Sequence, residues 1–405
     1  MKRAIVLSGG GGKGAYQIGF WKAIRELGIN YDIVTGTSIG ALNGAFMVQG
    51  NYNDAFKLWY NMDYNQVIEG GLNASYYDKG RKKVILKYAK GAVKGGLSVP
   101  GLEKIIDDNL KTDLFYSSKI DYGLVTVKFP SLKPVMLTKS KISKELLPDY
   151  LLASASCFPA FKMKEINKES YIDGGYYDNM PIDLAISMGA DEIIGVDLRA
   201  PGKRKKVKNT NVPITTISSK NDIGNFLVLE KKQTRRAIKL GYNDTMKTFG
   251  VLEGNYFTFR KGTLKRNYNR LSNRFFDNVS LYLKRGNNEK KYQRLIRLND
   301  EKYFNQILEN VMKVFNFDDT NIYRTSFVNL LIKEKYKKEK KTSLSFVKKA
   351  IKTGKLNKTF LDKELICYIY DEIKKDKPHG KALSNLLTLF PKSFMCAVYL
   401  KTIFK

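Results

Sequence analysis

Short apolar runs alternate with amphipathic stretches at the start of the chain. Ala4–Leu7 is an apolar run that predicts a buried strand, and Tyr31–Thr35 predicts a second one. Ala15–Leu27 carries apolar residues at helical spacing and is followed by Gly28, a common residue at helix ends. Ile39–Val48 predicts a second helix, made of small and apolar residues. Strands that alternate with helices favour a parallel sheet covered by helices.

The alternation continues further along the chain and then changes in character. Strands are predicted at Asp121–Val127, Pro134–Thr138, Ser170–Ile172, Ile193–Leu198 and Ile214–Ser218, and helices at Leu146–Ser156, Ile182–Met188 and Asn225–Phe249. Beyond about residue 260, strand patterns fade and Lys, Asn, Tyr and Phe dominate, with amphipathic segments such as Ser343–Ile351. We expect two domains: residues 1–260, an α/β three-layer sandwich with a mainly parallel central sheet, and residues 261–405, a Lys-rich, mainly helical region of unknown role.

Charge is distributed unevenly between the two halves. The net charge of +32 divides into 25 Lys and Arg against 21 Asp and Glu in residues 1–200, and 46 against 18 in residues 201–405. Such a basic half attracts anionic phospholipid surfaces, nucleic acid or acidic proteins, or serves only solubility. Because we find neither an aromatic-rich RNA-binding signature nor zinc-ligand spacing, we expect no nucleic acid partner.

Hydrophobic segments are too short for a secretory leader or a membrane span. Only four apolar residues follow Met1-Lys2-Arg3 before the glycine run, and no stretch reaches the roughly 18 apolar residues of a span. Cys157, Cys367 and Cys396 lie far apart and fit a reducing compartment. We expect a cytoplasmic protein that can associate with the periphery of a membrane without crossing it.

The pentapeptide Gly36-Thr37-Ser38-Ile39-Gly40 follows a predicted strand and opens a predicted helix. A G-x-S-x-G sequence in that context is typical of a nucleophile elbow, in which the serine hydroxyl is exposed on a tight, strained turn. The two glycines permit such a turn. An ordinary helix N-cap serine is the alternative interpretation.

Ser8–Gly14 is a glycine-rich loop between a predicted strand and a predicted helix. It does not fit the phosphate-binding pattern GxxxxGK[ST], because Leu7 replaces the first glycine and Gly14 the final hydroxyl residue. Gly9, Gly11 and Gly14 match the dinucleotide pattern GxGxxG, but the second strand does not end in the acidic residue that the pattern requires. An oxyanion hole of backbone N–H groups that faces Ser38 accounts for both motifs together.

A serine nucleophile needs a base, and histidine is scarce here. The single histidine, His379, lies in the Lys-rich second half, and we interpret it as a loop residue. Asp173 ends a predicted strand and is followed by Gly174 and Gly175, which allow a sharp turn and a close approach. A desolvated aspartate can act as the base, although Asp-Gly-Gly also occurs in ordinary turns.

Four blocks, in this order, resemble those of the patatin-like phospholipase family. They are Gly9-Gly10-Gly11-Gly12-Lys13-Gly14, Gly36-Thr37-Ser38-Ile39-Gly40, Ala153-Ser154-Ala155-Ser156 with Pro159 and Phe161, and Asp173-Gly174-Gly175. The resemblance implies a patatin-like catalytic domain over residues 1–260, a Ser38–Asp173 dyad supported by Gly174 and Gly175, an oxyanion hole in the first block, and no metal or cofactor. Ser8 departs from the family, many members of which have Asp before the glycines.

From these observations we expect a serine esterase or phospholipase that hydrolyses acyl esters of lipids through an acyl-enzyme. A catalytically weak lipid- or acyl-binding protein on the same fold is the alternative, against which the intact Ser38 and Asp173 argue. A nucleotide-binding protein that uses the glycine loop is a further alternative, which nucleotide-binding measurements would test. The lipid headgroup, the acyl position and the role of residues 261–405 do not follow from the sequence.

Overall fold

The computed structural model describes residues 1–63, 66–67, 81–208, 211–285, 300–338, 362–375 and 381–404. They divide into two compact units, Met1–Thr248 and Phe249–Lys405. The first unit ends at Thr248, before the boundary expected near residue 260. The difference arises because a short hairpin, β9 (Leu252–Glu253) and β10 (Thr258–Arg260), groups with the second unit. His379 and the predicted helix Ser343–Ile351 lie outside the described residues.

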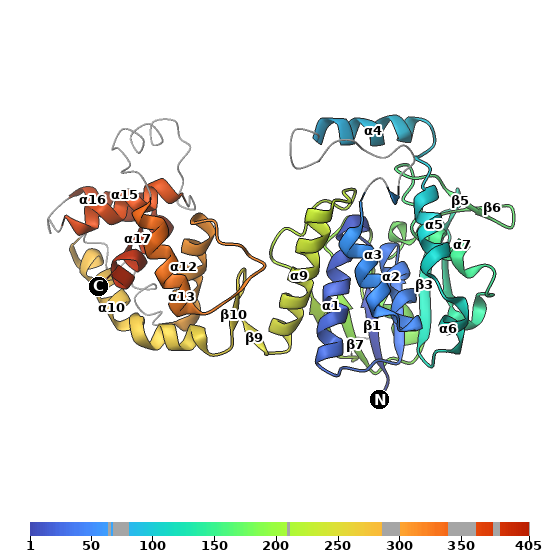
Figure 1. Ribbon diagram of the computed structural model, residues 1–405, viewed down its shortest axis with the longest axis horizontal. Coiled ribbons are helices and arrows are strands. Elements are labelled where there is room, and N and C mark those ends of the chain that lie inside the picture. The colour runs from blue at the N-terminus through green and yellow to red at the C-terminus, as the bar shows by residue number, and fades with distance from the viewer. Residues whose placement is uncertain are drawn as a thin grey trace. The chain divides into compact units, whose positions relative to one another are not determined.

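The first unit is built on a mixed, mainly parallel sheet, as the sequence predicts (Figure 1). Its strand order is β5-β6-β3-β2-β1-β7-β8, and β4 pairs with β3. The strands are β1 (Arg3–Leu7), β2 (Ile33–Thr37), β3 (Asp121–Phe129), β4 (Pro134–Thr138), β5 (Lys164–Ile166), β6 (Glu169–Asp173), β7 (Glu192–Val196) and β8 (Ile214–Ile217). Pairs among β8, β7, β1, β2 and β3 are parallel, whereas β4, β5 and β6 pair antiparallel.

Helices cover both faces of this sheet. They are α1 (Ala15–Glu26), α2 (Ile39–Gln49), α3 (Tyr52–Asn61), α4 (Arg81–Val93), α5 (Pro100–Asn109), α6 (Thr112–Ser117), α7 (Leu147–Ser154), α8 (Ile182–Ser187) and α9 (Lys231–Thr248). Ala4 and Val6 of β1 share a buried cluster with Ala185 of α8, so α8 packs on one face of the sheet. Gly44 of α2 lies near Leu7, because a Cβ added to this glycine would contact the Leu7 side chain, so α2 packs on the opposite face. Alternation along the strand therefore produces three layers.

Two sequence predictions in this unit need correction. The second strand extends through Thr37 rather than ending at Thr35, so Ser38 is the first residue beyond the sheet. The helix predicted for Asn225–Phe249 begins only at Lys231. The Asn225 side chain accepts the Leu227 N–H at 2.9 Å, and this local turn replaces the first helical turn.

The second unit is mainly helical, as predicted, and also contains a small sheet. Its described helices are α10 (Thr263–Arg285), α12 (Glu301–Val314), α13 (Thr325–Lys337), α15 (Lys363–Lys374), α16 (Lys381–Leu389) and α17 (Pro391–Phe404). They enclose an aromatic core in which Phe275, Phe304 and Tyr399 are fully buried. β10 pairs antiparallel with β9 and parallel with β11 (Ile322–Tyr323), strands that the sequence did not predict. Among the helices in the described part of the chain, none is long and apolar enough to span a membrane.

Candidate active site

Ser38 occupies a strained turn between β2 and α2. Its backbone angles are φ 56° and ψ −127°, in a region that side-chain-bearing residues rarely adopt. The turn is tight, because a Cβ on Gly36 would lie 2.3 Å from the Gly40 oxygen, and one on Gly40 would lie 2.3 Å from the Leu7 oxygen. Only glycine fits at either position. The strand–turn–helix context predicted for Gly36, Thr37, Ile39 and Gly40 is confirmed.

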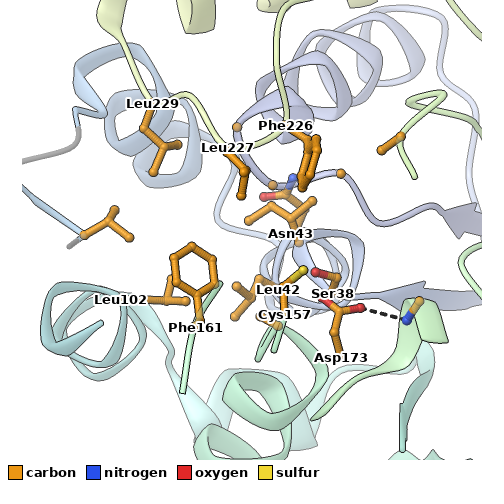
Figure 2. A pocket seen from close by; sticks show the side chains of 18 of the residues that line it. Ser38, Leu42, Asn43, Leu102, Cys157, Phe161, Asp173, Phe226, Leu227 and Leu229 are labelled. Carbon is orange, nitrogen blue, oxygen red and sulfur yellow. Dashed lines mark hydrogen bonds between the residues drawn. The ribbon is translucent and has the colours of Figure 1, made fainter. Parts of the chain in front are cut away.

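Sheet register places Asp173 level with Ser38. Thr37 pairs with Val125 in the parallel β2–β3 ladder, and Asp173 pairs with Thr126 in the antiparallel β3–β6 ladder. Figure 2 shows the two side chains adjoining at one end of a pocket. The Ser38 side chain is close enough to favour the ionised form of the Asp173 carboxyl group.

The Asp173 carboxyl group is buried, and its ionisation is perturbed accordingly. Burial raises its pKa from 3.8 to about 6, and hydrogen bonds from the Ser38 side chain and the Gly175 backbone partly oppose the rise. The Gly175 N–H donates to the carboxylate at 2.7 Å. A carboxylate with this pKa is a stronger base than an exposed aspartate and is still mostly ionised at neutral pH.

Some backbone N–H groups of the glycine loop already donate hydrogen bonds within the protein, and others do not. Gly9 donates to the Asn179 oxygen at 3.1 Å, and Gly12 donates to the Phe226 oxygen at 2.8 Å. Within the described part of the chain, the Gly10 and Gly11 N–H groups have no acceptor, and both residues line the same pocket as Ser38. These two groups can therefore donate to a bound oxyanion.

Two glycines of this loop also serve packing. A Cβ on Gly11 would lie 2.2 Å from the Phe226 oxygen, and one on Gly12 would lie 1.9 Å from the Val228 oxygen. Lys13 points elsewhere, because its ammonium group donates to the backbone oxygens of Leu198 and Arg199 at 3.4 and 3.2 Å. Lys13, Gly9 and Gly14 do not line the pocket.

The pocket beside Ser38 and Asp173 is apolar and has a volume of about 480 Å³. Aliphatic and aromatic side chains from separate segments form most of its wall, as Figure 2 shows for several of them: Leu42, Phe46, Trp59, Leu102, Phe161 and Leu227. A pocket of this kind suits an extended apolar group, with the reactive polar atoms confined to one end.

Residues 5–186 match the family model described as patatin-like phospholipase. The chain carries a patatin-like phospholipase domain. Patatin-like phospholipase domain-containing protein 7 of Rattus norvegicus is 28% identical over 214 residues, which are 51% of this chain and 14% of the rat protein. The human domain-containing protein 6 is 29% identical over 207 residues, 48% of this chain and 13% of that protein.

The chain therefore covers only a small part of the length of these curated relatives. Among solved structures, VipD from Legionella pneumophila covers 100% of this chain and 91% of its own, with a TM-score of 0.40 and 14% identity.

Ser154 is a site residue of the patatin-like domain whose role the sequence did not reveal. Its hydroxyl accepts the Ser38 N–H at 2.9 Å and donates to the Val125 oxygen at 2.7 Å. It thereby fixes the backbone of the strained turn to β3. The sequence identified Ser154 only as part of the third block of the family resemblance, because no spacing rule links it to Ser38.

Buried amide side chains brace the pocket wall of the domain. Trp59 donates through its indole nitrogen to the Asn43 oxygen at 2.8 Å, and the Asn43 nitrogen donates to Gln17 at 2.8 Å. Gln17 in turn donates to the Ser8 oxygen at 2.8 Å, next to the glycine loop. The available sequence signal was Asn43 itself, a polar residue in an otherwise small and apolar helix.

The basic loop Pro201–Lys208 also belongs to the surroundings of the site. The Lys203 N–H donates to the Gly175 oxygen at 2.8 Å, and its oxygen accepts the Asn179 N–H. Arg204 forms an ion pair with Asp197 at 2.6 Å. The loop therefore holds the Asp173-Gly174-Gly175 turn from one side. In the part of the chain that the structure describes, no cluster of three or more His, Cys, Asp or Glu side chains could hold a metal ion.

Proposed function

We propose that the chain is a serine lipid acyl hydrolase, with Ser38 as nucleophile and Asp173 as base. The observation that carries the proposal is the position of the two side chains: Ser38 stands on a strained turn, beside a buried carboxylate of raised pKa, at one end of an apolar pocket. Neither an N-cap serine nor an ordinary Asp-Gly-Gly turn accounts for all three features. The patatin-like phospholipase match supports the same reaction class.

In the proposed reaction, Asp173 takes the proton from the Ser38 hydroxyl as the oxygen attacks the ester carbonyl. The oxyanion that forms accepts hydrogen bonds from the Gly10 and Gly11 N–H groups, and α2 begins directly after Ser38, so that its N-terminal dipole favours the same charge. The tetrahedral intermediate then expels the alcohol, which takes the proton from Asp173. Water then attacks the acyl-enzyme and gives a proton to Asp173, and the bond to Ser38 breaks as the serine oxygen takes that proton back, which releases the acid.

The substrate we propose is a lipid whose acyl chain fills the apolar pocket. About 25 cal/mol per Å² of buried apolar surface supports binding of such a chain, whereas a small polar ester gains little. The net charge of +28 over residues 201–405, from 46 basic and 18 acidic residues, would draw the protein to the periphery of an anionic membrane. We therefore expect anionic phospholipids to be better substrates than zwitterionic ones.

The test compares the wild type with Ser38→Ala and Asp173→Asn on p-nitrophenyl acyl esters and on phosphatidylglycerol vesicles. Ser117→Ala and Asp108→Asn, whose side chains are exposed and do not line the pocket, are the matched controls. We expect both site variants to lose almost all turnover and both controls to keep it. A fluorophosphonate probe should add its mass to Ser38 of the wild type and not to the Ser38→Ala variant.

Two results would remove the proposal. One is a wild type that hydrolyses no acyl ester and does not react with the fluorophosphonate. The other is full activity in Ser38→Ala. If fatty acid still binds in either case, the chain is an acyl-binding protein on this fold.

A further inference from the structure

Two parallel strands of the second unit end side by side, and each leads into a helix. Phe259 of β10 pairs with Tyr323 of β11, so Arg260 and Arg324 follow at the same edge. After a short turn α10 begins at Thr263, and α13 begins at Thr325. The Thr325 hydroxyl donates to the backbone oxygen of Thr263 at 3.0 Å, which joins the two helix starts directly.

These helix starts line a concavity of about 630 Å³ within the second unit. Of the residues that the structure describes, five basic ones and no acidic one line it: Arg260, Lys261, Arg266, Arg270 and Arg324. Among the described residues, none of the five has a carboxylate partner. The first turns of both helices also lack Asp and Glu. The positive ends of two helix dipoles and five cations therefore act on the same space.

The floor of the concavity contains a buried donor that is not used. The Thr263 side chain is 5% exposed, and its hydroxyl oxygen has no hydrogen-bond partner within the described residues. Buried hydroxyl groups nearly always have a partner, so this one calls for a ligand. The neighbouring Asn267 is fully engaged, because it bonds Tyr399 at 3.0 Å and Asn329 at 2.9 Å, and this network keeps the floor rigid.

One acidic side chain does reach the start of α10. Glu253 accepts the Leu264 N–H at 2.7 Å and so occupies one backbone donor of the first turn. Glu253 does not line the concavity, and the Thr263 hydroxyl and the arginine side chains are left to meet a ligand.

We propose that this concavity binds a phosphate monoester group. A tetrahedral dianion matches two converging helix starts, because their N–H groups and positive ends favour anions. Planar guanidinium groups form paired hydrogen bonds to phosphate oxygens, and four of the five cations here are arginines. A single carboxylate carries too little charge for this number of cations. The group comes either from a phosphorylated lipid headgroup or from a soluble phosphate, which share this chemistry.

The experiment uses the full-length chain and two probes. Inorganic phosphate is titrated by calorimetry, and sedimentation measures binding to phosphatidylcholine vesicles that contain either phosphatidylinositol 4-phosphate or phosphatidylserine at matched surface charge. The variants are Arg266→Ala/Arg324→Ala and Thr263→Val. Lys265→Ala, in the same turn of α10 but outside the concavity, is the control.

We expect phosphate to bind, and the double arginine variant to weaken that binding at least about tenfold, because it removes hydrogen bonds between charged groups. Thr263→Val should weaken binding several-fold without lowering the thermal stability of the ligand-free protein, whose hydroxyl has no partner to lose. Lys265→Ala should bind as the wild type does. Preferential binding to the phosphoinositide vesicles would identify a lipid headgroup as the source, and phosphate binding without it would identify a soluble ligand.

Three outcomes would overturn the proposal: binding of neither probe, equal losses in Lys265→Ala and the double arginine variant, or equal binding to both kinds of charged vesicle with no effect of free phosphate. Each outcome would show that the concavity is part of a generally basic surface and not a specific phosphate site. The Ser38→Ala variant should bind as the wild type does, so the result is independent of the proposed hydrolysis.

Discussion

Replacing Asp173 with Asn should abolish activity and stabilise the first unit. The wild-type carboxylate is buried, and its pKa rises from 3.8 to about 6. The folded protein therefore holds the Asp173 proton more tightly than the unfolded chain does. Ionisation of Asp173 lowers the free energy of unfolding. This loss is absent below pH 3.8 and complete above about pH 6. Asn keeps the shape and an oxygen that can accept the Gly175 N–H, but it carries no charge.

The size of the gain follows from the pKa shift. At 1.36 kcal/mol for each pKa unit, the rise from 3.8 to about 6 corresponds to about 3 kcal/mol at pH 8. At pH 5, Asp173 is already ionised in the unfolded chain and mostly protonated in the folded protein. The gain in stability of the Asn variant should therefore fall to about half at that pH.

Urea unfolding followed by tryptophan fluorescence measures this gain. The chain has 2 tryptophans, Trp21 and Trp59, and both lie in the first unit, so the signal reports that unit alone. The wild type, Asp173→Asn and the exposed control Asp108→Asn are compared at pH 8 and pH 5. A variant that is no more stable than the wild type at pH 8, or whose gain is the same at both pH values, would refute the reasoning.

Three further predictions concern the site. If Asp173 must be ionised to accept the Ser38 proton, kcat/KM should fall about tenfold per pH unit below about pH 6; a profile that stays flat down to pH 5 would contradict this role. Ser154→Ala leaves the buried Ser38 N–H without an acceptor, which costs about 1–3 kcal/mol and should lower kcat at least fivefold, whereas Ser154→Thr should restore most of it; equal rates in all three proteins would show that the contact does not position Ser38. Leu102→Trp narrows the apolar pocket and should reduce turnover of long-chain relative to short-chain p-nitrophenyl esters; Leu114→Trp, at a side chain that is 52% exposed, should leave the chain-length profile unchanged.

Local sequence signals were sufficient for the elements that carry the site. The apolar run before Gly36 and the small residues after Ser38 predicted the strand and the helix of the turn, because a buried parallel strand and a packed helix each impose a short-range pattern. Asp173 followed from its position before two glycines. That Asp173 lies beside Ser38 did not follow from spacing, since β6 joins the sheet antiparallel and on the far side of β3. The family resemblance supplied that contact.

Other parts of the site depend on contacts that no periodic pattern in the sequence predicts. Ser154 meets the Ser38 backbone from a helix that is remote in sequence, and the loop at Lys203 holds the Gly175 turn through backbone atoms, which any residue would offer. The short strands β10 and β11 are too brief for an alternating pattern, so the paired helix starts of the second unit were not foreseen. The sequence showed the excess of basic residues in the second half of the chain, but it did not show that five of them gather around Thr263.

The contacts of the glycine loop have a consequence for the order in which the chain is made. Gly11 and Gly12 leave the ribosome well before Phe226 and Val228, the residues that pack directly on them. The segment matched by the family model, residues 5–186, also ends before them. A growing chain thus contains Ser38 and Asp173 well before the Gly12 N–H finds its acceptor and α1 is covered by α9. We expect the proposed hydrolase activity to appear only when the first unit is complete, so that a partly synthesised chain would not act on nearby membranes.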